Sequence, residues 1–93
     1  MNQNCTVSIS EFAEKQLRKI PLHIKEALQS WVTTIQRIGV METRKLTGFH
    51  DEPLKGDRKG QRSIRLNRAY RAIYIETQKG ISLVVIEVNK HDY

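Results

Sequence analysis

Apolar residues follow a helical period in the first part of the chain and a strand period in the last part. In the first part they lie four, three, four and three positions apart, at Ile24, Leu28, Trp31, Ile35 and Ile38. Residues with this spacing form one stripe along a helix, and such a stripe needs a partner surface. We therefore expect this helix to pack on a sheet, with Trp31 in the core rather than on a base-stacking surface.

A short strand and a shorter helix are predicted before that stripe. Apolar side chains alternate in residues 4–9, which is typical of a strand with one buried face. A helix is expected from about residue 10 to 19, with Ser8 or Ser10 as its N-cap. Pro21 ends it, because proline has no N–H to donate to the preceding turn, and proline is also suited to open the next helix.

The second half of the chain changes from helix to strand. Gly39 is expected to cap the second helix, residues 40–47 to add a short helical turn, and residues 48–60 to form a loop. β-Branched and aromatic residues become frequent after that loop. Three strands are predicted there, with a hairpin turn at residues 78–80 before the last: 62–67, 69–77 and 81–90.

The predicted element order is therefore β-α-α-β-β-β. Two consecutive helices with apolar stripes can form a hairpin that covers a sheet. The expected fold class is α+β, with a helical hairpin packed on one face of a twisted, mainly antiparallel four-stranded sheet. A parallel partner for the first strand would require a right-handed helical crossover.

Length and composition favour one ordinary globular domain over residues 1–93. The chain is 39% hydrophobic and 28% charged, and its longest apolar run, residues 83–86, is far too short for a membrane span. We find no export signal at the N-terminus, so a cytoplasmic location is expected. The lone Cys5 and three scattered histidines form no zinc pattern, and we expect neither a metal nor a small-molecule cofactor.

The net charge of +6 is concentrated in one stretch, residues 55–71. This stretch holds seven of the sixteen basic residues and a single acid, Asp57, while the rest of the chain has nine of each sign. Charge gathered at one place implies an anionic partner at one surface. A solvated basic face and a docking surface for an acidic protein are the alternatives to a catalytic role.

The arginines of this stretch are also compatible with a helix. They lie four, three, three and three positions apart, at Arg58, Arg62, Arg65, Arg68 and Arg71. However, Ile64 and Leu66 alternate, and the β-rich residues 72–75 continue the run. We therefore favour a loop and two antiparallel strands.

Two registers are possible for the hairpin between these strands. A three-residue turn at 67–69, with one residue at positive φ, places Arg65 opposite Arg71, whereas a two-residue turn places Arg65 opposite Tyr70. Paired arginines destabilise a sheet unless an anion lies between them. We favour the first register, with phosphate as the anion, because the planar guanidinium donates two hydrogen bonds to phosphate oxygens. Neighbouring phosphates can be held by residues of the preceding loop: Lys55, Arg58 and Lys59.

The C-terminal segment carries candidate chemistry. On an extended last strand, Asn89, His91 and Tyr93 project to one side and Lys90 to the other. Histidine exchanges protons near neutral pH, and tyrosine can stack on a base or orient a phosphate. With arginines nearby, these groups suffice for metal-free RNA cleavage by the 2′-hydroxyl. The alternative is that His91 is merely an exposed surface residue or a purification remnant.

Four segments in order resemble a known family: residues 53–58, 60–66, 69–74 and 88–93. The set is similar to the RelE/ParE superfamily of toxins from bacterial toxin–antitoxin systems, particularly its HigB-like and RelE-like mRNA interferases. The resemblance implies a RelE-like fold and a ribosome-dependent, metal-independent endoribonuclease that cleaves translated mRNA and stops growth. It also implies a cognate antitoxin, the ribosome and mRNA as partners.

The resemblance also implies roles for individual residues. Arg71 falls at the phosphate-stabilising arginine of the family's Tyr-Arg motif, and Arg65 at a basic residue that supports it. Lys55 lies in the Pro-Leu-Lys-Gly segment of the HigB-like branch. His91 and Tyr93 fall in the terminal segment that often supplies proton transfer and stacking. Further RNA or phosphate contacts are expected from Arg58, Lys59, Arg62, Arg68 and Lys90.

The sequence departs from the HigB-like pattern at two places. A histidine is expected directly before Pro-Leu-Lys-Gly, but Glu52 stands there and His50 lies two positions earlier. That branch often ends in Asp-Tyr-His, whereas this sequence ends at Tyr93. The general acid and base can therefore be His91 with His50, His91 with Glu52, or His91 alone.

Two other functions fit parts of the sequence. A ParE-like toxin would share the fold but poison DNA gyrase. The C-terminal residues His91 and Tyr93 favour the ribonuclease over this alternative. A non-catalytic nucleic-acid-binding module would use the basic hairpin only to track phosphates. Such modules usually expose aromatic residues on their sheet for base stacking. Tyr70 and Tyr74 can equally be core residues, so this alternative is the weaker one.

Overall fold

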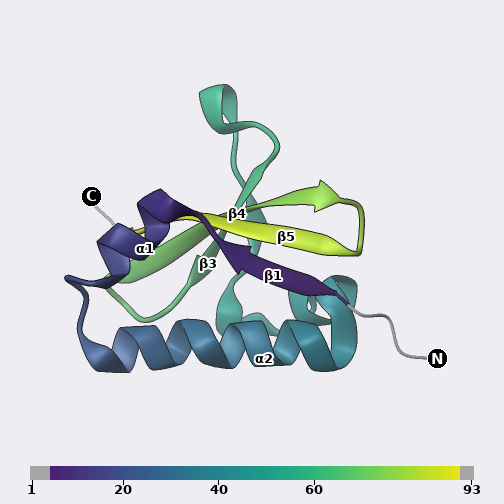
Figure 1. Cartoon of the computed structure of the whole chain (residues 1–93). Coiled ribbons are helices and arrows are strands. Elements are labelled where there is room, and N and C mark those ends of the chain that lie inside the picture. Colours follow the sequence, from purple (N-terminus) through teal and green to yellow (C-terminus); the bar gives the residue numbers. More distant parts are fainter. Residues whose placement is uncertain (1–4, 91–93) are drawn as a thin grey trace.

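A five-stranded sheet in the order β1-β5-β4-β3-β2 forms the centre of the computed structural model, which describes residues 5–90 (Figure 1). β1 pairs in parallel with β5, and the other three pairings are antiparallel. The strands are β1 (Thr6–Ile9), β2 (Glu52–Pro53), β3 (Gln61–Arg65), β4 (Tyr70–Gln78) and β5 (Ser82–Lys90). The predicted α+β fold with a mainly antiparallel sheet is confirmed, as is the β-structure of the arginine stretch.

The sheet has one strand more than expected. Glu52 and Pro53 lie within the predicted loop, yet they pair with Ser63 and Arg62 of β3 as the short edge strand β2. Proline is tolerated there because an edge strand does not need every N–H for its ladder. The extra strand fixes the position of Glu52 beside β3.

Two α-helices and two short 3₁₀-helices complete the fold: α1 (Glu11–Leu17), α2 (Leu22–Arg44), η1 (Thr47–Phe49) and η2 (Gly56–Arg58). α2 lies along one face of the sheet, while α1 lies against β5 (Figure 1). Of the two predicted caps, Ser10 is the one used, since its Oγ accepts a hydrogen bond from Ala13 N at 3.1 Å. No helix in the described part of the chain is long and apolar enough to cross a membrane.

Gly39 divides α2 into two helical segments. Its φ of 84° and ψ of 167° are not helical, and the chain returns to helix directly afterwards. The positive φ agrees with the predicted glycine cap. A second helical segment then runs to Arg44, in agreement with the short helical turn predicted at residues 40–47. Val40 and Thr43 are buried in it, and Thr43 Oγ1 donates to Gly39 O at 2.7 Å.

The core lies between α2 and the sheet. Ile24, Leu28, Trp31 and Ile35 are buried, whereas Ile38 at the end of the predicted stripe is 44% exposed, directly before the break in the helix. The ring of Trp31 lies 4.9 Å from that of Tyr74, centroid to centroid. Trp31 is therefore core, as predicted. The strands supply Ile64, Ala72, Tyr74, Leu83, Val85 and Val88.

α1 covers the part of β5 that β1 leaves open. β1 pairs with residues 82–85 of β5 only. Beyond that point, Val88 N donates to Gln16 Oε1 of α1 at 2.7 Å. The helix thus satisfies a backbone group that an exposed sheet edge would leave open to other chains.

Candidate functional site

The β3–β4 hairpin places two arginines side by side. Arg65 pairs with Arg71, and Leu66 N donates to Tyr70 O at 2.9 Å, which leaves residues 67–69 as the turn. The three-residue register predicted from the sequence is confirmed.

The expected positive φ in that turn is wrong. Among the described residues other than glycine, His50 has the single positive φ. The turn is instead closed by the side chain of Asn67, whose Oδ1 accepts hydrogen bonds from Ala69 N and Tyr70 N, both at 2.7 Å. Asparagine stabilises turns in this way without a left-handed residue.

The paired arginines lie on the sheet face opposite α2. Side chains alternate along a strand, and the neighbours Ile64 and Ala72 belong to the core under α2. Arg71 also pairs with Asn89 of β5. A polar row of Arg65, Arg71 and Asn89 therefore crosses three adjacent strands.

A cavity of about 200 Å³ opens over this row. Its size is below the roughly 300 to 1,000 Å³ of drug-sized ligand sites, and three arginines face a single acid in its wall. Arg71 Nε is buried and has no hydrogen-bond partner among the described residues. The cavity can therefore hold a small anionic group that accepts hydrogen bonds. It is lined by His50, Glu52, Ser63, Arg65, Asn67, Arg68, Tyr70 and Arg71.

His50 and Glu52 form the other wall of the cavity. His50 follows η1 in a left-handed conformation, with φ 50° and ψ 49°, and its Nε2 lies 3.7 Å from Glu52 Oε2. Glu52 pairs with Ser63 across β2 and β3, and Ser63 lines the same cavity. The structure thus brings both sequence candidates for a second proton-transfer group to the arginine pair.

The other predicted phosphate contacts lie outside the cavity wall. Arg58 of η2 pairs with Glu87 of β5 and donates from Nε to Gln61 Oε1 at 2.8 Å, whereas Arg62 Nε donates to Asp51 Oδ1 at 2.6 Å. Both guanidinium groups therefore have protein partners. Lys55 and Lys59 are exposed on either side of η2, and Lys90 is exposed at the end of β5.

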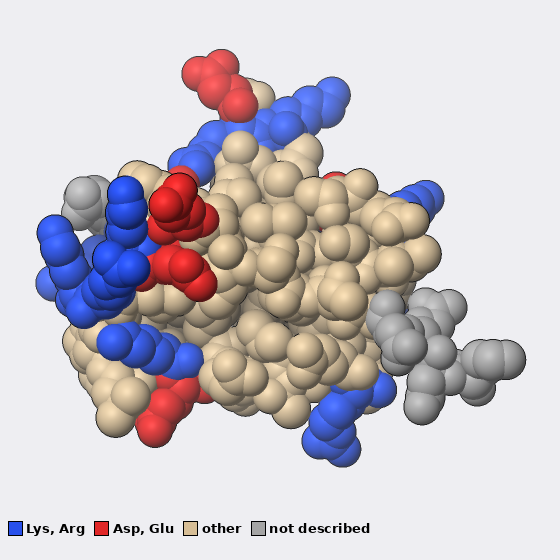
Figure 2. Space-filling view, viewed as in Figure 1, with Lys and Arg blue, Asp and Glu red and all other residues tan. Residues whose placement is uncertain are grey.

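Basic side chains also gather elsewhere on the molecular surface. Figure 2 shows Lys and Arg gathered at the end of the molecule where α1 lies and on the projecting loop, with Asp and Glu among them. The basic surface is therefore broken by acids, and the cavity is the place where three arginines meet one acid.

Comparison with known proteins identifies the fold. The sequence matches no protein-family model and no curated protein. The structure is similar to a YoeB/ParE toxin from Agrobacterium tumefaciens, with a TM-score of 0.72 and 20% identity over 94% of this chain and 99% of that chain. It is also similar to an archaeal RelE–RelB complex from Pyrococcus horikoshii, with a TM-score of 0.72 and 19% identity over 95% and 96% of the two chains. The chain has the RelE-like fold.

A third solved structure agrees with this assignment. The RelBE2 toxin–antitoxin complex from Mycobacterium tuberculosis matches with a TM-score of 0.70 and 21% identity, over 95% of this chain and 99% of that chain. The RelE-like fold predicted from four short segments is thus confirmed over almost the whole length of the chain.

Two predicted site residues, His91 and Tyr93, lie outside the described residues. The RelE-like fold is described up to Lys90, and Asn89 lies beside Arg71. The proton-transfer and stacking roles of His91 and Tyr93 therefore stay predictions.

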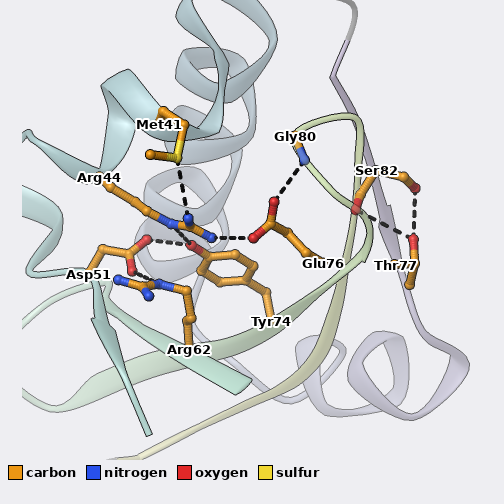
Figure 3. A network of polar contacts seen from close by, with 9 residues as sticks. All are labelled: Met41, Arg44, Asp51, Arg62, Tyr74, Glu76, Thr77, Gly80 and Ser82. Carbon is orange, nitrogen blue, oxygen red and sulfur yellow. Dashed lines mark hydrogen bonds and ion pairs between the residues drawn. The ribbon is translucent and has the colours of Figure 1, made fainter. Parts of the chain in front are cut away.

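A buried polar network behind the cavity was missed by the sequence analysis. The side chain of Asp51 is 2% exposed, and its Oδ2 accepts a hydrogen bond from Tyr74 OH at 2.6 Å (Figure 3). Burial, reinforced by the Asp51 hydrogen bond, raises the pKa of Tyr74. The hydrogen bond from Arg44 holds the pKa of Glu76 below its ordinary value. No local pattern indicates such contacts, because they join residues far apart in the sequence.

Among residues 5–90, no group of three or more His, Cys, Asp or Glu side chains lies together in a way that can hold a metal ion. The buried Cys5 is a free thiol whose pKa is raised by burial.

Proposed function

We propose that this chain is the toxin of a toxin–antitoxin system: a ribosome-dependent, metal-independent endoribonuclease that cleaves translated mRNA and stops growth. The observation that carries the proposal is the arginine-lined cavity of a RelE-like fold, in which the buried Arg71 Nε has no partner within residues 5–90 and His50 and Glu52 lie opposite. A phosphodiester is an anion with several acceptor oxygens, so it suits that donor set.

In the proposed mechanism the RNA supplies its own nucleophile. A base on the protein removes the proton of the 2′-hydroxyl, and the 2′-oxygen then attacks the adjacent phosphorus. Arg65 and Arg71 stabilise the negative charge of the phosphorane by hydrogen bonds and by their own charge. The bond from phosphorus to the 5′-oxygen breaks, and an acid on the protein protonates that oxygen. The products are a 2′,3′-cyclic phosphate and a 5′-hydroxyl.

The acid and the base are His91 with His50, His91 with Glu52, or His91 alone. His50 and Glu52 lie at the cavity, and His91 follows Lys90 of β5. Tyr93 is proposed to stack on a base of the message. Substituting a true acid or base is expected to slow cleavage by roughly 10² to 10⁴. Single-turnover rates of His50→Ala, Glu52→Gln and His91→Ala therefore assign the pair.

The ends of the cleaved message test this chemistry directly. Purified protein added to programmed ribosomes is expected to leave 5′-hydroxyl ends, which polynucleotide kinase labels without prior dephosphorylation, and 2′,3′-cyclic phosphate ends. Fragments with 5′-phosphate ends would contradict the proposal, because 2′-hydroxyl attack expels the 5′-oxygen without its phosphate.

The proposed protein partner is a cognate antitoxin. The solved complexes from Pyrococcus horikoshii and Mycobacterium tuberculosis each contain a toxin with its antitoxin. We propose that an acidic or amphipathic segment of the antitoxin covers the basic face around the cavity. It would neutralise charge and block the message at the same time.

A further inference from the structure

Asp51 stands between the two candidate proton-transfer residues but faces the other way. His50 and Glu52 line the cavity. The Asp51 side chain, only 2% exposed, instead reaches Arg62 and Tyr74 (Figure 3), and it does not line that cavity. Glu52 begins the extended strand β2, and neighbouring side chains of an extended segment point to opposite sides. The burial of Asp51 therefore directs Glu52 to the cavity side, and it holds the backbone next to the left-handed His50.

Both carboxylate oxygens of Asp51 are occupied. Oδ1 accepts from Arg62 Nε at 2.6 Å, and Oδ2 accepts from Tyr74 OH at 2.6 Å. Charge-assisted hydrogen bonds of this length are strong. A buried carboxylate that keeps both partners cannot rotate or leave its site without losing them.

The partners of Asp51 are themselves held in place. Tyr74 is fully buried against Trp31 and accepts a hydrogen bond from Arg44 Nε at 3.1 Å. Arg44 Nη2 lies 2.8 Å from Glu76 Oε1, and Glu76 Oε2 accepts from Gly80 N at 2.8 Å. Figure 3 shows this line of contacts from α2 to the β4–β5 turn. Asp51 is thus attached to the rigid core of the fold.

Apart from the Asp51 side chain, this segment is held by the pairing of Glu52 and Pro53 with β3 and by a hydrogen bond from His50 N to Thr47 O at 3.1 Å. β2 has only two residues, and both are exposed. His50 adopts a left-handed conformation with φ 50°, which a residue with a side chain keeps only where its surroundings fix it. The side chains of His50 and Glu52 are both more than half exposed, so core packing does not hold them.

We infer that Asp51 is a positioning residue: its buried carboxylate, held by Arg62 and Tyr74, fixes His50 and Glu52 against the arginine pair. This inference rests on the proposed ribonuclease function. The group transferring the proton must lie within hydrogen-bond reach of the RNA, so a small displacement of the segment is costly even when every catalytic group remains.

Asp51→Asn tests the inference, because the amide keeps the shape but loses the charge and one acceptor. Displacement by about 1 Å is expected to lower the single-turnover cleavage rate on programmed ribosomes by about 10²-fold. Affinity for a message with a 2′-deoxy residue at the cleavage site should stay within about twofold, because Arg65 and Arg71 are unchanged. An equal loss of affinity and rate would contradict a positioning role.

Glu76→Gln is the matched control. It removes a carboxylate from the other end of the same network, where Glu76 contacts Arg44 and Gly80 but neither Asp51 nor the cavity. We expect it to lower the thermal stability and to leave the cleavage rate of the folded protein unchanged. If both variants slow cleavage equally, the effect of Asp51 is one of general stability and the inference fails.

A second measurement does not depend on cleavage. The imidazole NMR signals of His50 are expected to move in Asp51→Asn, while those of His23, exposed at the start of α2, serve as an internal reference. Unmoved His50 signals together with a wild-type cleavage rate would overturn the inference. A wild-type protein that cleaves no message would refute the proposed function, yet the His50 signals would still decide the positioning role.

Tyr74→Phe is the alternative test of the inference if the Asp51→Asn variant does not fold. It keeps the ring against Trp31 and removes only the hydroxyl that donates to Asp51. A smaller loss in rate, about 10-fold, is expected because the Arg62 contact remains. A wild-type rate with unmoved His50 signals would again contradict the inference.

Discussion

The guanidinium of Arg71 combines three properties that a phosphate ligand needs. It is adjacent to a second arginine, it lines the cavity, and its buried Nε has no partner among the described residues. The like-charge pair Arg65 and Arg71 destabilises the empty sheet by some tenths of a kcal/mol. An anion between the two arginines would turn that repulsion into attraction.

Arg71→Ala is therefore expected to reduce cleavage by about 10²- to 10³-fold, the usual cost of losing one donor to a developing oxyanion. Growth arrest should be relieved, and the melting temperature should not fall. Arg37→Ala, which removes an exposed arginine of α2 away from the cavity, is the control and should remain toxic. Full toxicity of Arg71→Ala would refute the site.

The pair of Arg44 and Glu76 gives stability a defined pH dependence. The hydrogen bond from Arg44 lowers the pKa of Glu76 below its ordinary value of 4.5. A carboxyl with a lowered pKa contributes stability that is complete above its ordinary pKa and lost as the pH falls through the lowered one.

Glu76→Gln should therefore melt below wild type at about pH 7, and the difference should shrink as the pH falls to about 3. Thermal unfolding followed by circular dichroism across that range measures it. A difference in melting temperature that stays constant with pH would contradict the assigned role of the carboxylate.

At the scale of elements, an ion pair joins the loop around η2 to β5. Arg58 of η2 contacts Glu87 of β5, and Asn89 Nδ2 donates to the other oxygen of Glu87 at 2.6 Å. Because Asn89 pairs with Arg71, this contact joins η2 to the strand on which the polar row of the cavity ends.

A charge exchange tests that attachment. Arg58→Glu should repel Glu87, release the loop and speed its limited proteolysis, and Arg58→Glu with Glu87→Arg should restore resistance. A double variant as sensitive as the single one would show that the ion pair does not hold the loop. RNA affinity that returns with the loop would assign Arg58 to positioning, whereas affinity that stays low would support the direct phosphate contact predicted from the sequence.

Elements that depend on the spacing of residues close together in the sequence were predictable. The stripe of α2, the turn at residues 78–80 and the arginine register each follow from the spacing of a few neighbours. β2 was missed because two residues between glycines carry no periodicity. The break at Gly39 was predictable, because the positive φ that ends a helix favours glycine. Asp51 was missed because its partners are Arg62 and Tyr74 on other strands.

At the scale of the molecule, the two faces of the sheet have different roles. One face packs on α2 and supplies stability, and the other bears the cavity. The polar network around Asp51 connects the two faces of the sheet, because it begins in the core and ends beside His50 and Glu52. The site of this RelE-like fold can therefore be altered at Arg65 and Arg71 with little effect on the core.

The central claim, that the protein cleaves translated messages, is tested most directly in growing cells. Wild type and Arg71→Ala are induced without an antitoxin, and message 5′ ends are mapped by primer extension. We predict new ends at codon-related positions within translated regions, present with wild type and absent with Arg71→Ala. Intact messages together with DNA damage would contradict the claim and identify a gyrase poison instead.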